Sequence, residues 1–102
     1  MKTIAIIPAR MAATRFPGKP MEEILGIPMI GHCYYRTKLS KLVDEVYVAT
    51  CDKIIFNYIE SIGGKAIMTS NKHERATERT AEAILNIEKM TSNYYDTIVM
   101  VQ

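Results

Sequence analysis

The sequence has 102 residues, of which 48% are hydrophobic and 24% charged, so we expect residues 1–102 to form part of a single domain with one modest core. The net charge of +2 and the pI near 8.6 come without a basic stripe interleaved with aromatic residues, which argues against a nucleic acid partner. No run approaches about 18 consecutive apolar residues, so no membrane-spanning segment is predicted.

A short apolar run at Thr3–Pro8 predicts the first strand, and a strongly basic loop follows it. Arg10, Arg15 and Lys19 lie close together in this loop, and the first 21 residues contain no Asp or Glu that could neutralise them. Gly18 permits a tight turn beside Lys19, so the three cations can converge on one anion. The loop is therefore predicted to bind a polyphosphate, the alternative being a solvated basic surface loop.

Further along the chain, helical patterns alternate with short runs rich in Ile and Val. A helix is predicted from near Pro28 to about Leu42, a second after Asp52 as N-cap and ending at Gly63-Gly64, and a third from near Thr77. The runs predict three more strands, at Glu45–Thr50, Lys65–Met68 and Thr97–Val101. The first and last of the four predicted strands have no polar face, which is typical of strands that are buried on both sides.

The spacing within the second and third helices predicts which side chains face the core. In the second helix these are Ile54, Ile55, Tyr58, Ile59 and Ile62, and in the third they are Ala81, Ile84 and Leu85. The alternation of strands and helices predicts an α/β fold with a Rossmann-like, mostly parallel sheet and helices on both faces. Because ligands of such sheets bind beyond the carboxyl ends of the strands, the basic loop lies where a nucleotide is expected.

The basic loop also carries a recognisable pattern, Arg10-x4-Arg15-x-Pro17-Gly18-Lys19-Pro20. It resembles the amino-terminal signature of the sugar cytidylyltransferases, most closely the family that acts on 3-deoxy-manno-octulosonate (Kdo). It does not match a Walker P-loop, because Pro20 rather than Ser or Thr follows Gly18-Lys19. The resemblance implies the nucleotide-diphospho-sugar transferase type of fold, which would be incomplete in this chain.

A second polar segment, residues 68–79, leads into the third predicted helix. It resembles the family's His-x-Ser-Gly-Thr-x-Arg loop on the nucleobase side, and His73, Thr77 and Arg79 match it. Arg75 and Ala76 stand where the family has Ser-Gly, which puts the base contacts and the identity of the sugar in question. The alternative is a solvated, well-capped helix start. His73 is interpreted as a structural or surface histidine, since no carboxylate or serine partner occurs at a spacing typical of a catalytic pair. His32, beside Cys33-Tyr34-Tyr35, is interpreted as structural too.

The resemblance implies a cytidylyltransferase that uses CTP and an acidic 3-deoxy-2-keto sugar to give CMP-sugar and pyrophosphate, for lipopolysaccharide or surface polysaccharide synthesis. Arg10, Arg15 and Lys19 would then stabilise the phosphate charges as catalytic residues. The nucleotide-binding residues that it implies are Pro8, Ala9, Arg10, Thr14, Arg15, Lys19, Thr69, Thr77, Arg79 and Gln102.

The resemblance to the family covers this chain from Ile4 to Gln102, but it covers only the amino-terminal part of the family's proteins. It implies Mg²⁺ as cofactor, with ligands beyond Gln102 and none within this chain, and a homodimer for the full-length protein. We therefore expect the 102-residue chain by itself to be inactive. Pro8 and Arg10 interrupt the first apolar run before it could form a signal peptide, and Cys33 and Cys51 are isolated, which predicts a cytoplasmic protein with reduced, buried thiols.

Two alternatives stay open. One is a related nucleotidyltransferase for another nucleotide or acidic sugar. The other is a non-catalytic module that binds a nucleotide, or binds a partner protein through the sheet edge at the last strand.

Overall fold

The structure, a computed structural model, describes residues 2–11, 19–72 and 75–101. Its strands are β1 (Thr3–Pro8), β2 (Glu23–Ile24), β3 (Ile27–Pro28), β4 (Glu45–Thr50), β5 (Ala66–Met68) and β6 (Thr97–Met100). Its helices are α1 (Met29–Lys38), α2 (Lys53–Ser61) and α3 (Ala76–Thr91), with a short 3-10 helix at Lys19–Met21. The four main strands and three helices that the sequence predicts are confirmed, with boundaries that differ by a few residues.

The main sheet has four parallel strands in the order β5-β4-β1-β6. Ile4 of β1 lies opposite Glu45 of β4 on one side and opposite Ile98 of β6 on the other. The chain therefore adds strands in one direction from β1 to β5 and then returns to the opposite side of β1. The reversal point lies between β1 and β6.

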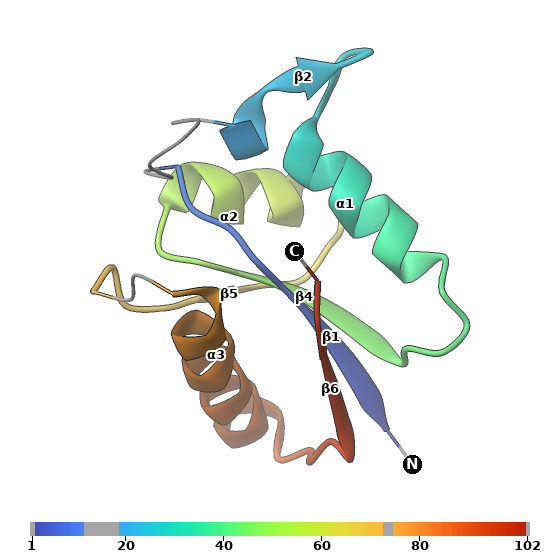
Figure 1. The fold of residues 1–102 in the computed structure, drawn as a ribbon, viewed down its shortest axis with the longest axis vertical. Coiled ribbons are helices and arrows are strands. Elements are labelled where there is room, and N and C mark those ends of the chain that lie inside the picture. Colours follow the sequence, from blue (N-terminus) through green and yellow to red (C-terminus); the bar gives the residue numbers. More distant parts are fainter. Residues whose placement is uncertain (1, 12–18, 73–74, 102) are drawn as a thin grey trace.

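The helices cover both faces of this sheet, as predicted (Figure 1). On one face α1 and α2 pack against the strands, and the buried residues are Ala5, Ile7, Ile30, Tyr34, Val46, Val48, Ile55, Ile59 and Ala66. On the other face α3 packs alone, and the buried residues are Ile4, Ile6, Tyr47, Ala49, Ala83, Ile84 and Ile87. Successive residues of β1 thus point to opposite cores, which explains its unbroken apolar run. A crossover of constant hand requires the helix to change face when strand addition reverses, and α3 does so.

The first helix region differs from the prediction at both ends. Pro28 is not in the first turn of α1 but ends the two-residue strand β3, and the helix stops at Lys38, before Leu42. The small β2–β3 hairpin was not predicted. Its turn places Leu25 and Gly26 at φ of 54° and 81°, the left-handed backbone that two-residue hairpin turns require.

Several predicted core positions are wrong. Ile54 is 53% exposed and Leu85 60% exposed, and Ala81 is also exposed. Helical spacing shows which side of the helix a residue lies on, but it does not show how much of that side is buried. The buried face of α3 passes instead through Thr80, Ala83, Ile84 and Ile87. In the same way β6 is not buried on both sides, since it pairs with β1 alone and its residues are largely exposed.

The two cysteines are free, as predicted, but both are half-buried rather than fully buried. His32 makes the kind of structural contact that the sequence suggested, with its Nε2 2.8 Å from the carbonyl oxygen of Ile24 in the hairpin. Within the described ranges, none of the helices combines the length and the apolar character needed to cross a membrane.

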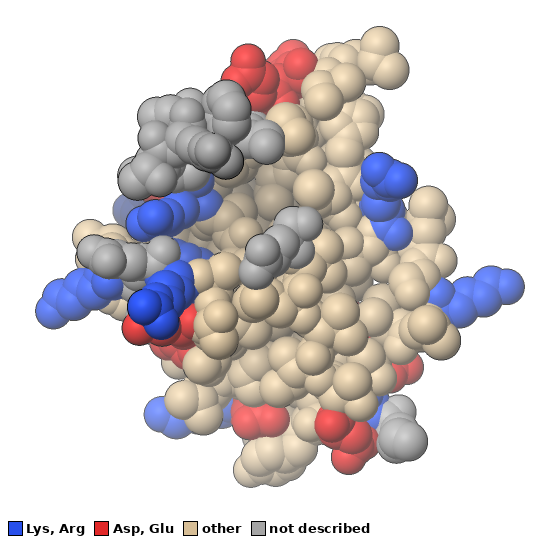
Figure 2. Space-filling view, viewed as in Figure 1, with Lys and Arg blue, Asp and Glu red and all other residues tan. Residues whose placement is uncertain are grey.

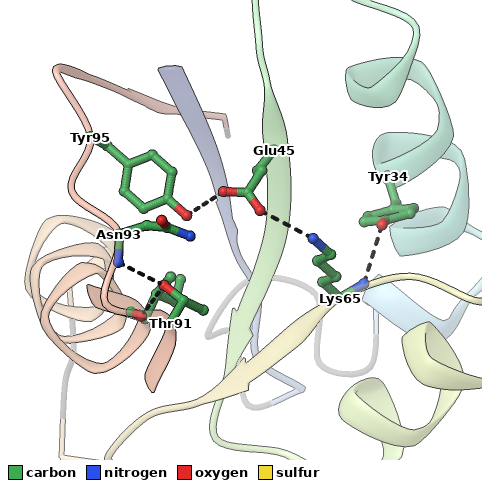
Figure 3. Close-up of polar contacts among 7 residues, drawn as sticks. Tyr34, Glu45, Lys65, Thr91, Asn93 and Tyr95 are labelled. Atoms are coloured by element: carbon green, nitrogen blue, oxygen red, sulfur yellow. Dashed lines mark hydrogen bonds and ion pairs between the residues drawn. The ribbon is translucent and has the colours of Figure 1, made fainter. Parts of the chain in front are cut away.

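A polar cluster ties together the amino ends of the strands (Figure 3). Glu45 begins β4 and lies between Tyr95, whose hydroxyl donates to Oε2, and Lys65, whose Nζ lies 3.1 Å from Oε1. The backbone N–H of Lys65 donates to the hydroxyl of Tyr34, at 3.2 Å, so the cluster also reaches α1. The Tyr95 hydrogen bond and the Lys65 ammonium hold the pKa of Glu45 below its ordinary value, although partial burial opposes them.

This cluster predicts a specific acid sensitivity. A carboxylate with a lowered folded-state pKa stabilises the fold above its unfolded pKa, near 4.5, and the contribution is lost as the pH falls through the folded value. We expect thermal unfolding between about pH 6 and about pH 3 to show a smaller loss of stability for Glu45→Gln than for the original chain. Glu60→Gln, at an exposed position of α2, is the control, and an equal loss in all three proteins would contradict the assignment.

Candidate functional site

The residues singled out by the two sequence motifs approach one edge of the sheet, where the parallel strands end. β1 delivers Ala9 and Arg10 to this edge, β5 delivers Thr69, and α3 begins beside it with Thr77 and Arg79. Figure 2 shows basic side chains gathered on the side of the molecule where β1 ends and α3 begins. The structure thus brings the described parts of both motifs to the edge that contains the strand-order reversal.

The chain leaves β1 along a fixed path. The N–H of Ala9 donates to the carbonyl oxygen of Ala49, at 2.9 Å, and continues the sheet by one residue. The N–H of Met11 then donates to Asp52 Oδ2, at 2.8 Å. Arg10 lies between these two anchored peptide groups and is half-buried. Within residues 2–11, 19–72 and 75–101, no acidic side chain forms an ion pair with Arg10.

Asp52 was predicted as the N-cap of the second helix, and its position confirms that prediction. Its side chain, however, makes no capping hydrogen bond to α2. The carboxylate reaches across to Met11, with the thiol of Cys51 also 3.8 Å from Oδ2. The sequence did not predict this contact with Met11. An Asp just before a helix is already explained as an N-cap, so nothing in the sequence pointed to a second role.

A buried arginine of α3, Arg79, binds the residues that follow β5 in the second motif. Arg79 is only 2% exposed, and its Nη1 donates to Thr69 Oγ1 at 2.6 Å and to the carbonyl oxygen of Ser70 at 3.3 Å. The N–H of Thr69 donates to the carbonyl oxygen of Thr50 in β4, at 2.9 Å. Thr69 is therefore fixed from two sides, by the neighbouring strand and by α3.

The start of α3 carries the two residues that depart from the family pattern. Arg75 is the N-cap and is exposed, with extended backbone, and its N–H donates to Glu78 Oε1 at 3.3 Å. Ala76 is the first helical residue, and Thr77 is exposed in the first turn. The first-turn N–H groups of a helix are an electropositive end, here next to an exposed cation.

Several predicted site residues lie outside the described residues. These are Thr14, Arg15 and Gln102, together with the side chain of Lys19. His73, which was interpreted as structural, also lies outside the described residues. Their roles stay predictions.

No group of three His, Cys, Asp or Glu side chains close enough to hold a metal occurs in residues 2–11, 19–72 and 75–101. Arg10, the exposed Arg75 and the first-turn N–H groups of α3 are the features that suit this edge to anions.

Comparison with known proteins agrees with this chemistry. The family model described as "Cytidylyltransferase" matches residues 4–102. A 3-deoxy-manno-octulosonate cytidylyltransferase of Thermodesulfovibrio yellowstonii is 56% identical over 84 residues, which are 82% of this chain and 33% of that protein. One of Geotalea uraniireducens is 47% identical over all 102 residues, which span 38% of its length. The chain thus spans little more than a third of these curated relatives.

Two solved structures are similar throughout the chain. A CMP:2-keto-3-deoxy-manno-octonic acid synthetase complexed with CTP has a TM-score of 0.83 and 40% identity, and the match covers 100% of this chain and 40% of that one. A cytidylyltransferase from Leptospira borgpetersenii has a TM-score of 0.71 and 28% identity, over 99% of this chain and 41% of that one. With the sequence motifs, the fold and the family model in agreement, the chain belongs to the cytidylyltransferase family and corresponds to the amino-terminal portion of its Kdo-specific members.

Proposed function

We propose that this chain is the CTP-binding portion of an enzyme that activates Kdo as CMP-Kdo and releases pyrophosphate. The observation that carries the proposal is the placement of Arg10 and the Thr69–Arg79 pair at the carboxyl ends of the parallel strands, with Arg10 following β1, next to the strand-order reversal. The similarity to a synthetase that was solved with CTP supports the choice of nucleotide. Lipopolysaccharide or surface polysaccharide synthesis would consume the product, in the cytoplasm.

In this proposal the sugar hydroxyl attacks the α-phosphorus of CTP, and the bond to the β-phosphate oxygen breaks. Negative charge then builds on the α-phosphate oxygens and on the leaving pyrophosphate. Arg10, Arg15 and Lys19 would stabilise that charge. Arg10 is suited to this work because its peptide is anchored on both sides and its guanidinium is not neutralised by an acidic partner among the described residues.

The remaining predicted residues would face the nucleoside and the sugar. Pro8, Ala9 and Thr14 belong to the first motif, Thr69 and Thr77 to the second, and Gln102 ends the chain. Arg79 donates to Thr69 and to Ser70, so we propose that it also supports the residues on the nucleoside side of the site.

Two further parts of the function are proposals that rest on the family. Mg²⁺ would assist phosphate chemistry when bound, and its ligands are expected outside the residues described. The full-length protein is proposed to be a homodimer, and the 102-residue chain by itself to bind CTP without turnover.

The nucleotide preference can be tested directly on this chain. A ligand that binds the folded state raises the melting temperature, and at equal concentration the ligand that binds more tightly raises it further. We expect CTP to raise the melting temperature more than ATP, GTP or UTP does at the same concentration, measured by differential scanning fluorimetry. Equal shifts from all four nucleotides would reduce the site to a general phosphate binder and would contradict the assignment of the Thr69–Arg79 segment to the base.

The departure at Arg75-Ala76 favours a second candidate, a related nucleotidyltransferase for another nucleotide or acidic sugar. Restoring the family pattern with Arg75→Ser and Ala76→Gly tests, in the same assay, whether the departure changes the nucleotide preference. If the chain already prefers CTP and the double variant keeps that preference, the Kdo-type assignment is favoured. A preference that moves toward CTP only after the substitutions favours the second candidate. Arg75→Ser alone is the control, because serine is also a better N-cap than arginine.

A further inference from the structure

The two motif segments are joined by a continuous series of hydrogen bonds that crosses the end of β4. Met11 N–H donates to Asp52 Oδ2 at 2.8 Å, and Asp52 N–H donates to Thr50 Oγ1 at 3.1 Å. Thr50 then accepts from the N–H of Thr69, at 2.9 Å, through its carbonyl oxygen. Thr50 is fully buried, and Met11 and Asp52 are half-buried, so the series begins in the sheet and extends toward the surface.

Asp52 is the one side chain in this series that acts on the path of the basic segment. The backbone ladder between β1 and β4 ends with Ala9 N–H on the carbonyl oxygen of Ala49. Beyond that point the sheet offers Met11 no further ladder partner, and the Asp52 carboxylate takes its N–H instead. Since Arg10 lies between the two anchors, Asp52 restrains the backbone of the cation that is proposed to meet the nucleotide.

We propose that Asp52 is a positioning residue for nucleotide binding, acting through the N–H of Met11 on Arg10. This inference rests on the proposed function and deepens it. The carboxylate does not touch the nucleotide, and its negative charge would repel phosphate if it did. Its contribution is to order the Arg10 backbone before the ligand arrives, so that less conformational entropy is lost on binding.

The chain contains a matched contact at the opposite edge of the sheet. Asp44 lies just before β4, and its Oδ2 accepts the N–H of Thr3 at 2.7 Å. This is the same kind of bond, between an aspartate and a backbone N–H at an end of β1. Asp44 lies at the amino ends of the strands, away from the candidate site, and therefore controls for the general effect of losing such a bond.

The test is isothermal titration of the chain with CTP at a temperature where circular dichroism shows every variant folded. Asp52→Ser withdraws the carboxylate while leaving a residue that caps α2 well. It is expected to raise the Kd for CTP by about tenfold, the scale of a lost hydrogen bond to a charged group. Asp52→Asn keeps an acceptor oxygen at the same reach and should restore most of the affinity. Asp44→Ser should lower the melting temperature and leave the Kd unchanged.

Amide hydrogen exchange at Met11 without ligand gives a second measurement. The Met11 N–H should be protected in the original chain and exchange faster in Asp52→Ser. Unchanged CTP affinity in Asp52→Ser, or an equal loss in Asp44→Ser, would overturn the inference, as would unchanged exchange at Met11. Failure of the original chain to bind CTP would be a different result, since it would overturn the proposed function itself and this inference with it.

Discussion

Replacement of Lys19 by methionine, or of Arg15 by alanine, is expected to lower turnover by about 10²- to 10³-fold, the scale for losing one preorganised donor to developing charge. Both cations belong to the basic loop that follows β1, which contains no Asp or Glu, and both match the family signature. The measurement is pyrophosphate release from CTP and Kdo with Mg²⁺. It would use a chimera that continues this chain with the later residues of the Thermodesulfovibrio yellowstonii relative.

Lys41→Met is the matched control for this prediction. Lys41 is exposed in the turn after α1, so losing its charge should leave turnover within about twofold of the unsubstituted chimera. Turnover of Lys19→Met and Arg15→Ala at the level of this control would remove both residues from the proposed phosphate site. A matching loss in all three variants would point to a general effect of net charge.

Substitution of Arg79 by methionine is expected to destabilise the fold by about 2–3 kcal/mol, the cost of leaving buried polar groups without a donor. Methionine fills much of the same volume as arginine. The loss in free energy of unfolding therefore reports the missing guanidinium hydrogen bonds rather than a change in packing. The acceptors left behind include Thr69 Oγ1 and the carbonyl oxygen of Ser70. The free energy of unfolding, measured with urea, checks the magnitude.

The control for Arg79 is Arg36→Met, on the exposed side of α1. That change should alter the free energy of unfolding by no more than about 0.5 kcal/mol. A similar small effect at Arg79 would mean that the hydrogen bonds to Thr69 and Ser70 contribute little to stability. In that case the fixed position of Thr69 would depend on the β4 backbone alone.

The alternation of apolar runs and helical patterns was sufficient to predict the main architecture. β1 and β4 occupy the predicted residues, because strands buried on both sides leave an unbroken run of Ile, Val and Ala that is easily recognised. The same alternation places helices on both faces, which the structure confirms. The order of Arg10, Arg15 and Lys19 in the segment after β1 directed attention to nucleotide phosphates before any fold was known.

Exposure was less predictable than element type. Ile54 and Leu85 have the same helical spacing as their buried neighbours, yet both are more than half exposed, because the strands cover only part of each helix. The β2–β3 hairpin was missed since its strands have two residues each, too few for any period to appear.

By itself, the sequence determined the order of the four main strands and three helices, the basic segment after the first strand and the family to which the chain belongs. Only the tertiary structure decided which side chains support the site. Asp52 and Met11 are 41 residues apart, and their hydrogen bond exists because parallel pairing of β1 and β4 brings both carboxyl ends to one edge. Local spacing contains no trace of such a contact, since it depends on the register between strands and not on the residues that surround either partner.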